Sequence, residues 1–264
     1  MSSLRKTLIA ATLLGVIAAM TGCAAMQSMR AERALARGDY ERAVANLSRL
    51  LERDLPDDER AENLVRLAVA IDEGSISGEG DPIAHLDEAI RLAPQNATAH
   101  LIRAQMRAPL GDPGAVSDAD TALARAESPD SVFLAAAGDS YLIAGSPESA
   151  ITVYERALHV GADEELALRI HRNLAIAYRD VLDFERAAMH SAQHIALVRD
   201  FGTEPSVNAL AFHTTLQWLN NDIDAAVTML QSGALPPSER RRLIETFADP
   251  NLNAALAAAD RRGR

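Results

Sequence analysis

The chain has 264 residues, of which 48% are hydrophobic but only 4% are aromatic, and its formal net charge is −11. Strands favour β-branched and aromatic side chains, so an apolar set dominated by alanine and leucine argues against a β-sandwich and favours closely packed helices. An acidic chain of this kind is a poor candidate for binding nucleic acid or anionic lipid headgroups, since both need a basic face. We therefore expect an all-α protein with no nucleic-acid partner.

The first residues have the features of a targeting segment. Arg5 and Lys6 precede an uncharged, mostly apolar stretch over residues 7–20. This length and these flanks fit a secretory signal peptide over residues 1–22. An uncleaved membrane anchor is the alternative, because no charge occurs between Lys6 and Arg30 and a bilayer span needs roughly 20 apolar residues.

The residues Met20-Thr21-Gly22-Cys23 resemble the lipobox of bacterial lipoproteins, in which the cysteine is diacylated and becomes the mature N-terminus. The resemblance implies that Cys23 is lipidated and anchors the protein to a membrane. Ala24 is not the aspartate that retains lipoproteins at the inner membrane, so it also implies an outer-membrane anchor facing the periplasm. Cys23 is the only cysteine, which excludes disulfides within the chain and cysteine-based metal sites.

A helix pair is clearest over residues 131–164, a unit of 34 residues. Gly145 separates two helical patterns, and Ser146-Pro147 can start the second one, with the serine as cap and the proline at the first helical position. The apolar positions that share one face of each helix are Leu134, Ala137, Gly138 and Tyr141 in the first and Ala150, Tyr154, Ala157 and Leu158 in the second.

The start of the second helix recurs along the chain. Small polar residues that can cap a helix occur at Asp39, Asp112, Ser146, Asp183 and Asp222. An alanine follows four residues later in four of the five cases, and three residues later after Asp112. Such a recurrence predicts an array of similar units.

These positions resemble the tetratricopeptide repeat (TPR). The resemblance implies a right-handed α-solenoid of about six helix pairs over residues 23–240, with a concave groove, followed by a C-terminal capping helix or tail over residues 241–264. The small and polar residues over 74–80 are interpreted as an insertion between helices. They lack the spacing and strand-to-helix context of a nucleophile turn.

Chemistry-bearing motifs are few. No phosphate-binding or dinucleotide motif is present, so no cofactor is expected. His190 and His194 could share a helix face and bind a metal, but no third ligand is visible and we expect no metal site. Asp118 and Asp120 are two apart on a predicted helix, so we interpret them as solvated charges and expect no catalytic residue.

In the tetratricopeptide family the first helix of each pair lines the groove. Register then assigns nine groove residues: Gln105, Asp139, Arg169, Arg172, Asn173, Arg179, Phe212, Thr215 and Trp218. Arginines beside large aromatic residues are typical of a peptide-binding hot spot. The alternative is that the arginines form a solvated face and that Trp218 packs against the C-terminal helix.

A lipidated N-terminus followed by such repeats is similar to the assembly lipoproteins of type IV and Tad pili. The resemblance implies a non-enzymatic periplasmic scaffold that binds envelope proteins, a secretin among the candidate partners. An adaptor for peptidoglycan hydrolases and a component of outer-membrane protein assembly are alternatives. An enzyme with a site in the groove is less favoured, because the register supplies arginines without a partner acid or nucleophile.

Overall fold

The computed structural model describes residues 26–247 and contains helices and no strand within that range. A first helix covers residues 26–35. The others are α2 (Tyr40–Leu51), α3 (Asp57–Gly74), α4 (Pro82–Leu92), α5 (Ala97–Arg107), the short 3₁₀ helix η1 (Ala108–Leu110), α6 (Gly114–Arg125), α7 (Ser131–Ile143), α8 (Pro147–Gly161), α9 (Glu164–Asp180), α10 (Phe184–Asp200), α11 (Val207–Leu219), α12 (Ile223–Gln231) and α13 (Pro237–Phe247). The all-α prediction is confirmed. Within these residues, no helix combines the length and the apolar character needed to cross a bilayer.

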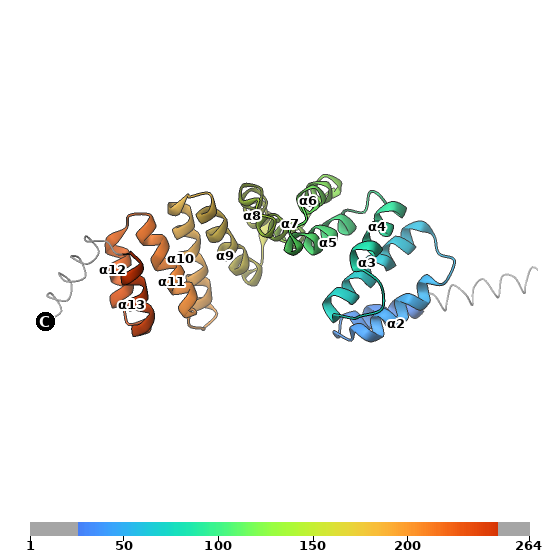
Figure 1. Ribbon diagram of the computed structural model, residues 1–264, viewed down its shortest axis with the longest axis horizontal. Helices are drawn as coiled ribbons and strands as arrows, with labels where there is room; N and C mark the ends of the chain where they lie inside the picture. Colours follow the sequence, from blue (N-terminus) through green and yellow to red (C-terminus); the bar gives the residue numbers. More distant parts are fainter. Residues whose placement is uncertain (1–25, 248–264) are drawn as a thin grey trace, which may run out of the picture. The chain divides into compact units, whose positions relative to one another are not determined.

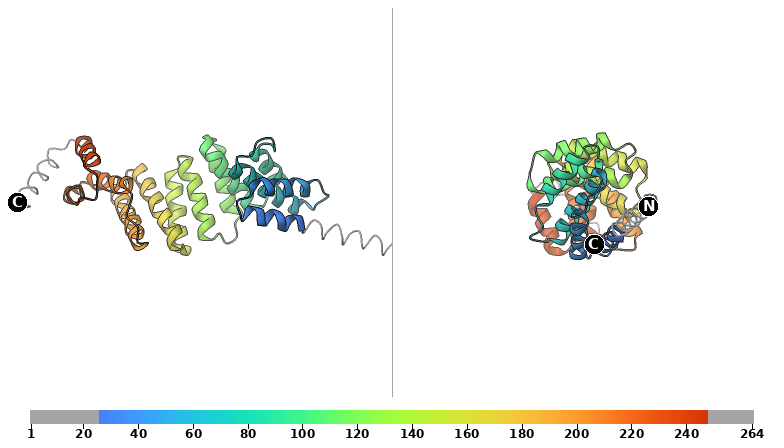
Figure 2. Two further views of the ribbon diagram at one scale, coloured as in Figure 1. Left: turned by 90° about the horizontal axis from the view of Figure 1, so that it is seen from below. Right: turned by 90° about the vertical axis from the view of Figure 1, so that its right-hand side faces the viewer.

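The described residues divide into two compact units, one formed by residues 26–110 and 117–126 and the other by residues 111–116 and 127–247. In the first unit α2 packs on α3, α3 on α4 and α4 on α5 (Figure 1). In the second, each helix from α7 to α12 packs on a neighbour in the chain, and α7 also contacts α9 (Figure 1, Figure 2). Contacts between helices two apart in the chain are what a stack of helix pairs produces.

Alanine determines how closely the helices approach. Ala43, Ala115, Ala150, Ala187 and Ala226, the residues that follow the five predicted caps, are all fully buried. Larger residues fill the remaining space in each unit: Val44, Leu47, Leu67 and Ile71 in the first, and Ile195, Leu210, Val227 and Leu230 in the second. The alanines that follow the caps therefore belong to the packed interior.

The turns within the pairs share one backbone geometry. The residue before each cap has a left-handed φ between 60° and 75°, at Gly38, Gly111, Gly145, Leu182 and Asn221. In four of these turns the cap residue's N–H donates to the carbonyl five residues earlier, at 2.8–2.9 Å. This satisfies a carbonyl that the end of the first helix leaves without a helical partner.

The caps agree with the prediction at aspartate but not at serine. The carboxylates of Asp39, Asp183 and Asp222 each accept a backbone N–H of the following helix, at 3.1–3.3 Å. Ser146 makes no such side-chain hydrogen bond, so the expected serine cap is wrong. There the left-handed Gly145 and Pro147 at the first helical position define the start of α8.

In the first unit Asp118 is buried, so the prediction that it is a solvated charge is wrong. The residue is 4% exposed, and its carboxylate accepts hydrogen bonds from Arg103 at 2.8 and 2.5 Å and from Arg107 at 2.9 Å. Both arginines belong to α5 and Asp118 to α6, so a buried ion-paired group joins the two helices. Asp120 is exposed, as expected.

The predicted C-terminal cap begins earlier than residue 241. Helix α13 starts at Pro237, packs on α11 and buries Leu243 and Phe247. The predicted signal peptide over residues 1–22, the lipidation site Cys23 and the tail beyond residue 247 lie outside the described residues.

Candidate protein-binding groove

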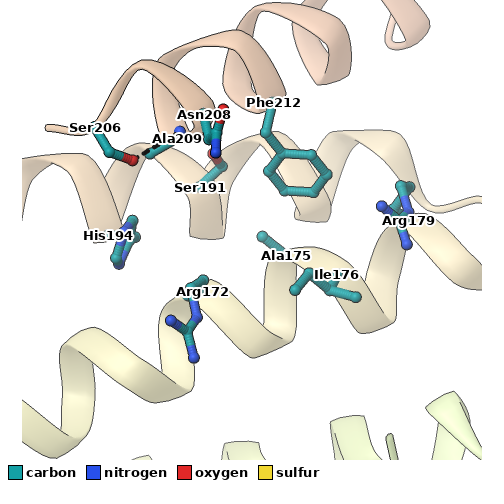
Figure 3. A pocket seen from close by; sticks show the side chains of 10 residues that line it. All are labelled: Arg172, Ala175, Ile176, Arg179, Ser191, His194, Ser206, Asn208, Ala209 and Phe212. Atoms are coloured by element: carbon teal, nitrogen blue, oxygen red, sulfur yellow. Dashed lines mark hydrogen bonds between the residues drawn. The ribbon is translucent and has the colours of Figure 1, made fainter. Parts of the chain in front are cut away.

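A cavity of 380 Å³ opens between α9, α10 and α11 in the second unit (Figure 3). It is lined by Arg172, Ala175, Ile176 and Arg179 of α9, Ser191 and His194 of α10, and Ser206, Asn208, Ala209 and Phe212 at the start of α11. Three of the predicted groove residues, Arg172, Arg179 and Phe212, therefore come together at one place. Arg172 and Arg179 come from α9 and Phe212 from α11, so the packing of these helices brings the three residues together.

The arginines give the cavity a cationic character. The Arg179 guanidinium lies over the Phe212 ring, 5.5 Å from its centroid, and pairs with Asp180 at 2.7 Å. Arg172 is exposed and donates to the Asn173 side chain at 3.3 Å. Arg172 forms no salt bridge among residues 26–247, so its charge is available to a carboxylate of a ligand.

The N-terminal end of α11 adds to this character. The Ser206 hydroxyl accepts the Ala209 N–H at 3.2 Å and caps the helix, while Asn208 and Ala209 line the cavity. The first turn of a helix carries a partial positive charge, which favours anionic groups. Phe212 points from α11 towards α9, where Ile176 and Ala175 supply apolar surface (Figure 3). The cavity thus combines anion-binding groups with an apolar floor.

Three other predicted groove residues form a polar network instead. Asp139 of α7 accepts hydrogen bonds from Tyr154 of α8 at 2.6 Å and from Asn173 of α9 at 2.8 Å, and it pairs with Arg169 at 2.5 Å. Burial and the neighbouring Asp139 charge raise the pKa of Tyr154 well above its usual range. This network joins three successive helices, and its residues are turned towards one another and not into the cavity.

The remaining three predicted residues lie elsewhere. Gln105 is exposed on α5, in the first unit. Thr215 donates its hydroxyl to the Ala211 carbonyl at 2.9 Å. Trp218 stacks on Phe247 of α13, with ring centroids 4.7 Å apart. Trp218 therefore packs against the C-terminal helix, as the alternative interpretation expected, and does not line the cavity.

A histidine pair lies between α9 and α10. The Nδ1 atoms of His171 and His190 are 2.9 Å apart, and the His190 ring stacks on Tyr178. Burial, followed by the proximity of His171, lowers the pKa of His190 to about 4. The Nδ1 atom of His194 instead makes a hydrogen bond with the Leu168 carbonyl at 3.0 Å. Across residues 26–247 no group of three or more potential ligands is arranged to hold a metal ion.

The sequence prediction missed the contribution of second helices and of helix starts. Ser191 and His194 lie on α10, although the family register assigns the groove to first helices only. Ser206 could have been found from its position before an apolar helical pattern, which is the signature of a cap.

No protein-family model and no curated protein matches the sequence. Solved structures with a similar fold do exist. PilW, described as a widely conserved type IV pilus biogenesis factor, has a TM-score of 0.61 at 15% identity, over 88% of this chain and 98% of that one. The chain has the tetratricopeptide-repeat fold.

Two further structures extend the comparison of this TPR protein. PilF of Pseudomonas aeruginosa gives a TM-score of 0.52 at 17% identity, over 78% of this chain and 92% of that one. MamA of Desulfovibrio magneticus RS-1 gives 0.53 at 19% identity, over 67% of this chain and 96% of that one. At these sequence identities, the similarity shows a shared fold and nothing more.

Proposed function

We propose that this TPR protein is a non-enzymatic scaffold that binds a protein partner in the cavity between α9, α10 and α11. The observation that supports it is the convergence of Arg172, Arg179 and the start of α11 around the Phe212 ring. Such a cavity suits a peptide segment with an acidic group beside an apolar side chain. Arginine and aromatic side chains are enriched among the residues that dominate binding free energy.

A scaffold agrees with the chemistry of the lining better than an enzyme does. None of the ten lining residues is a carboxylate or a cysteine. The Nδ1 atom of His194 is hydrogen-bonded to the Leu168 carbonyl at 3.0 Å. Among residues 26–247, His194 makes no hydrogen bond to either serine of the lining, so the cavity does not contain the paired nucleophile and base that acyl-transfer enzymes use.

The cellular setting that we propose is the outer membrane, with a lipid anchor on Cys23 and the repeats in the periplasm. The lipobox-like residues before Cys23 support the anchor. The similarity in fold to PilW, a type IV pilus biogenesis factor, supports a role in pilus or secretion-system assembly. A secretin is then a candidate partner.

The test is recovery of partners by cross-linking in cells. Replacing Arg172→Ala together with Phe212→Ala should lower recovery of the partner at least about tenfold, because truncating two hot-spot residues typically costs more than 1 kcal/mol each. The matched control is Arg199→Ala together with Phe201→Ala, an exposed arginine and an exposed aromatic of the same unit that do not line the cavity.

An unchanged set of partners in the Arg172→Ala, Phe212→Ala variant would contradict the assignment of the cavity. The identity of the recovered protein tests the proposed pathway. A secretin or pilus component supports pilus assembly, whereas a peptidoglycan hydrolase or a barrel-assembly protein would replace it by one of the alternative adaptor roles.

A further inference from the structure

Positive charge is concentrated at the N-terminal end of the first unit. Residues 26–51 contain five arginines and three acidic residues, whereas residues 52–81 contain three arginines and ten acidic residues. The net charge of −11 therefore conceals a local basic region. The expectation that an acidic chain avoids anionic lipid concerned the chain as a whole, and it does not hold for a surface on which the charges are segregated.

The basic residues share one exposed surface. Arg30, Arg33, Arg37, Arg42 and Arg49 line a cavity of 770 Å³ between the helix over residues 26–35 and α2, and all five are exposed. We call these five residues the arginine face. Two acidic residues also line the cavity, Asp39 and Glu41, and Asp39 pairs with Arg42 at 3.2 Å. The other four arginines form no salt bridge among residues 26–247, so the face keeps a net positive charge.

Exposed apolar side chains accompany this charge. Met26 is 45% exposed and Met29 is 48% exposed, and both lie on the same helix as Arg30 and Arg33. The spacing of residues 26, 29, 30 and 33 places them on one side of that helix, while Ala31 is buried on the other. Arginines beside apolar residues on an exposed helix surface are typical of segments that lie on a membrane.

The position in the chain also favours a membrane. Arg30 follows Cys23 by seven residues, which span about 10 Å as a helix and at most about 25 Å when extended. The uncharged, mostly apolar stretch over residues 7–20 ends ten residues before Arg30. Whether the chain is held by a lipid on Cys23 or by that stretch, the arginine face comes close to the headgroups. Arginine attraction to anionic lipid acts over about a Debye length, 8–10 Å.

We propose that the arginine face, together with Met26 and Met29, binds the surface of a membrane that contains anionic phospholipid. The arginines contact the phosphate groups, and the two methionines enter the boundary between headgroups and acyl chains. The contact fixes the orientation of the first unit on the bilayer, which a flexible tether alone would not do. The proposal is independent of the cavity between α9, α10 and α11.

Methionine oxidation tests it in the full-length chain reconstituted in vesicles. In phosphatidylcholine alone, a water-soluble oxidant should modify Met26 and Met29 readily. In an equal mixture of phosphatidylcholine and phosphatidylglycerol, their oxidation should slow at least about tenfold, since each arginine near an anionic surface shifts the binding equilibrium about fivefold. Met189, 51% exposed in the second unit, is the internal reference and should oxidise equally fast in both.

Two variants show whether the face is responsible. Replacing Arg30, Arg33 and Arg37 by glutamine should abolish the protection in phosphatidylglycerol vesicles. The matched control replaces Arg199, Arg240 and Arg241 by glutamine, the same charge change at exposed positions of the second unit, and should keep it. High salt should remove the protection in the unmodified chain, because it screens the attraction.

Equal oxidation of Met26 and Met29 in the two lipid compositions would overturn the proposal. So would an equal loss of protection in the two variants, since that result would assign the effect to net charge. Protection by added polyglutamate in phosphatidylcholine vesicles, without protection by phosphatidylglycerol, would overturn it in favour of an acidic protein partner. Circular dichroism of each variant checks that helix content is retained.

Discussion

Gly138 lies where the ring of Tyr154 approaches α7 most closely. A β-carbon at residue 138 would be 2.6 Å from that ring, and the ring cannot easily move because its hydroxyl donates to Asp139 and accepts from Asn173. We expect Gly138→Ala to lower the free energy of unfolding by about 1–3 kcal/mol, the usual cost of overpacking. Urea denaturation measures this.

The control for that prediction is the same substitution in a Tyr154→Leu background. A smaller side chain on α8 leaves room for the new methyl group, so the cost of Gly138→Ala should largely disappear there. An equal cost in both backgrounds would show that the ring is not the obstacle.

His190 makes a prediction about pH. Burial and the neighbouring His171 lower its pKa to about 4, whereas an unfolded histidine has a pKa of about 6.5. Between these values the unfolded chain binds the proton and the native chain does not, so His190 reduces stability as the pH falls from about 6.5 to 4. Above pH 6.5 it has no effect. The expected loss is up to about 3 kcal/mol, since one pKa unit corresponds to 1.36 kcal/mol.

Comparison with His190→Gln measures the contribution of the His190–His171 pair, because His171, whose own pKa burial lowers, contacts the ring that is replaced. Glutamine can still hydrogen-bond to His171 but does not titrate. The variant should lose less stability than the unmodified chain between pH 6.5 and 4, measured by denaturant unfolding at a series of pH values. His213, whose pKa burial also lowers, titrates in both proteins and cancels in the comparison. Identical pH profiles would refute the assignment.

At this scale the sequence predicted roles that depend on local geometry. Asp39, Asp183 and Asp222 cap helices because the N–H groups they accept are three residues away. It did not predict the partners of Asp118 or of His190, because Arg103 and His171 are 15 and 19 residues away on neighbouring helices. Only the packing of the helix pairs brings those side chains together.

Each turn inside a helix pair needs one residue with a left-handed backbone. Glycine takes this position at residues 38, 111 and 145, but Leu182 takes it between α9 and α10, with a φ of 65° and an exposed side chain. A left-handed conformation costs a residue with a β-carbon roughly 1–2 kcal/mol. Leu182→Gly should therefore raise the free energy of unfolding by about 1 kcal/mol.

Leu182→Ala is the matched control for that substitution. Alanine removes the exposed side chain but keeps the β-carbon, so it should leave stability almost unchanged. Thermal or urea unfolding of the two variants distinguishes relief of backbone strain from removal of an exposed apolar group. A gain of the same size in both would assign the effect to the side chain.

The ion pairs that join α4, α5 and α6 should differ in how much they stabilise the fold. Asp118 is buried against Arg103 and Arg107, while Asp87 of α4 contacts Arg103 at 2.7 Å with its side chain 52% exposed. Asp118→Asn should cost about 3 kcal/mol, because it removes the buried carboxylate that Arg103 and Arg107 share and leaves them with the exposed Asp87 as a shared anion. Asp87→Asn should cost less than about 1 kcal/mol, since water screens an exposed pair. Equal costs would contradict a structural role for Asp118.

The helix pairs themselves were predictable because their caps, glycines and alanines repeat. The limits of the C-terminal helix were not, since α13 starts at Pro237 with little to distinguish its first residues from a loop. The position of Trp218 could not be decided either. Its contact with Phe247 depends on how α13 folds back on α11, and register along a single helix does not contain that information.

At the scale of the whole molecule, the repeats place two different surfaces on separate units. The cavity between α9, α10 and α11 belongs to the second unit, and the arginine face belongs to the first. Register predicted that Arg172, Arg179 and Phe212 would share a surface. The arginine face was hidden in the sequence by the acidic residues that follow it. A segregated charge on the surface can be predicted only when it is known which sides of the helices are exposed.

The most direct test of the scaffold is site-specific photo-cross-linking in cells. A photoreactive amino acid in place of Ile176, which lines the cavity, should cross-link to a partner protein, and adding Arg172→Ala and Phe212→Ala should abolish that product. The same probe in place of Leu182, 73% exposed in the same unit but outside the cavity, should give no such product. Cross-linking from residue 182 in preference to residue 176, or a product at 176 that persists in the double variant, would contradict binding in the cavity.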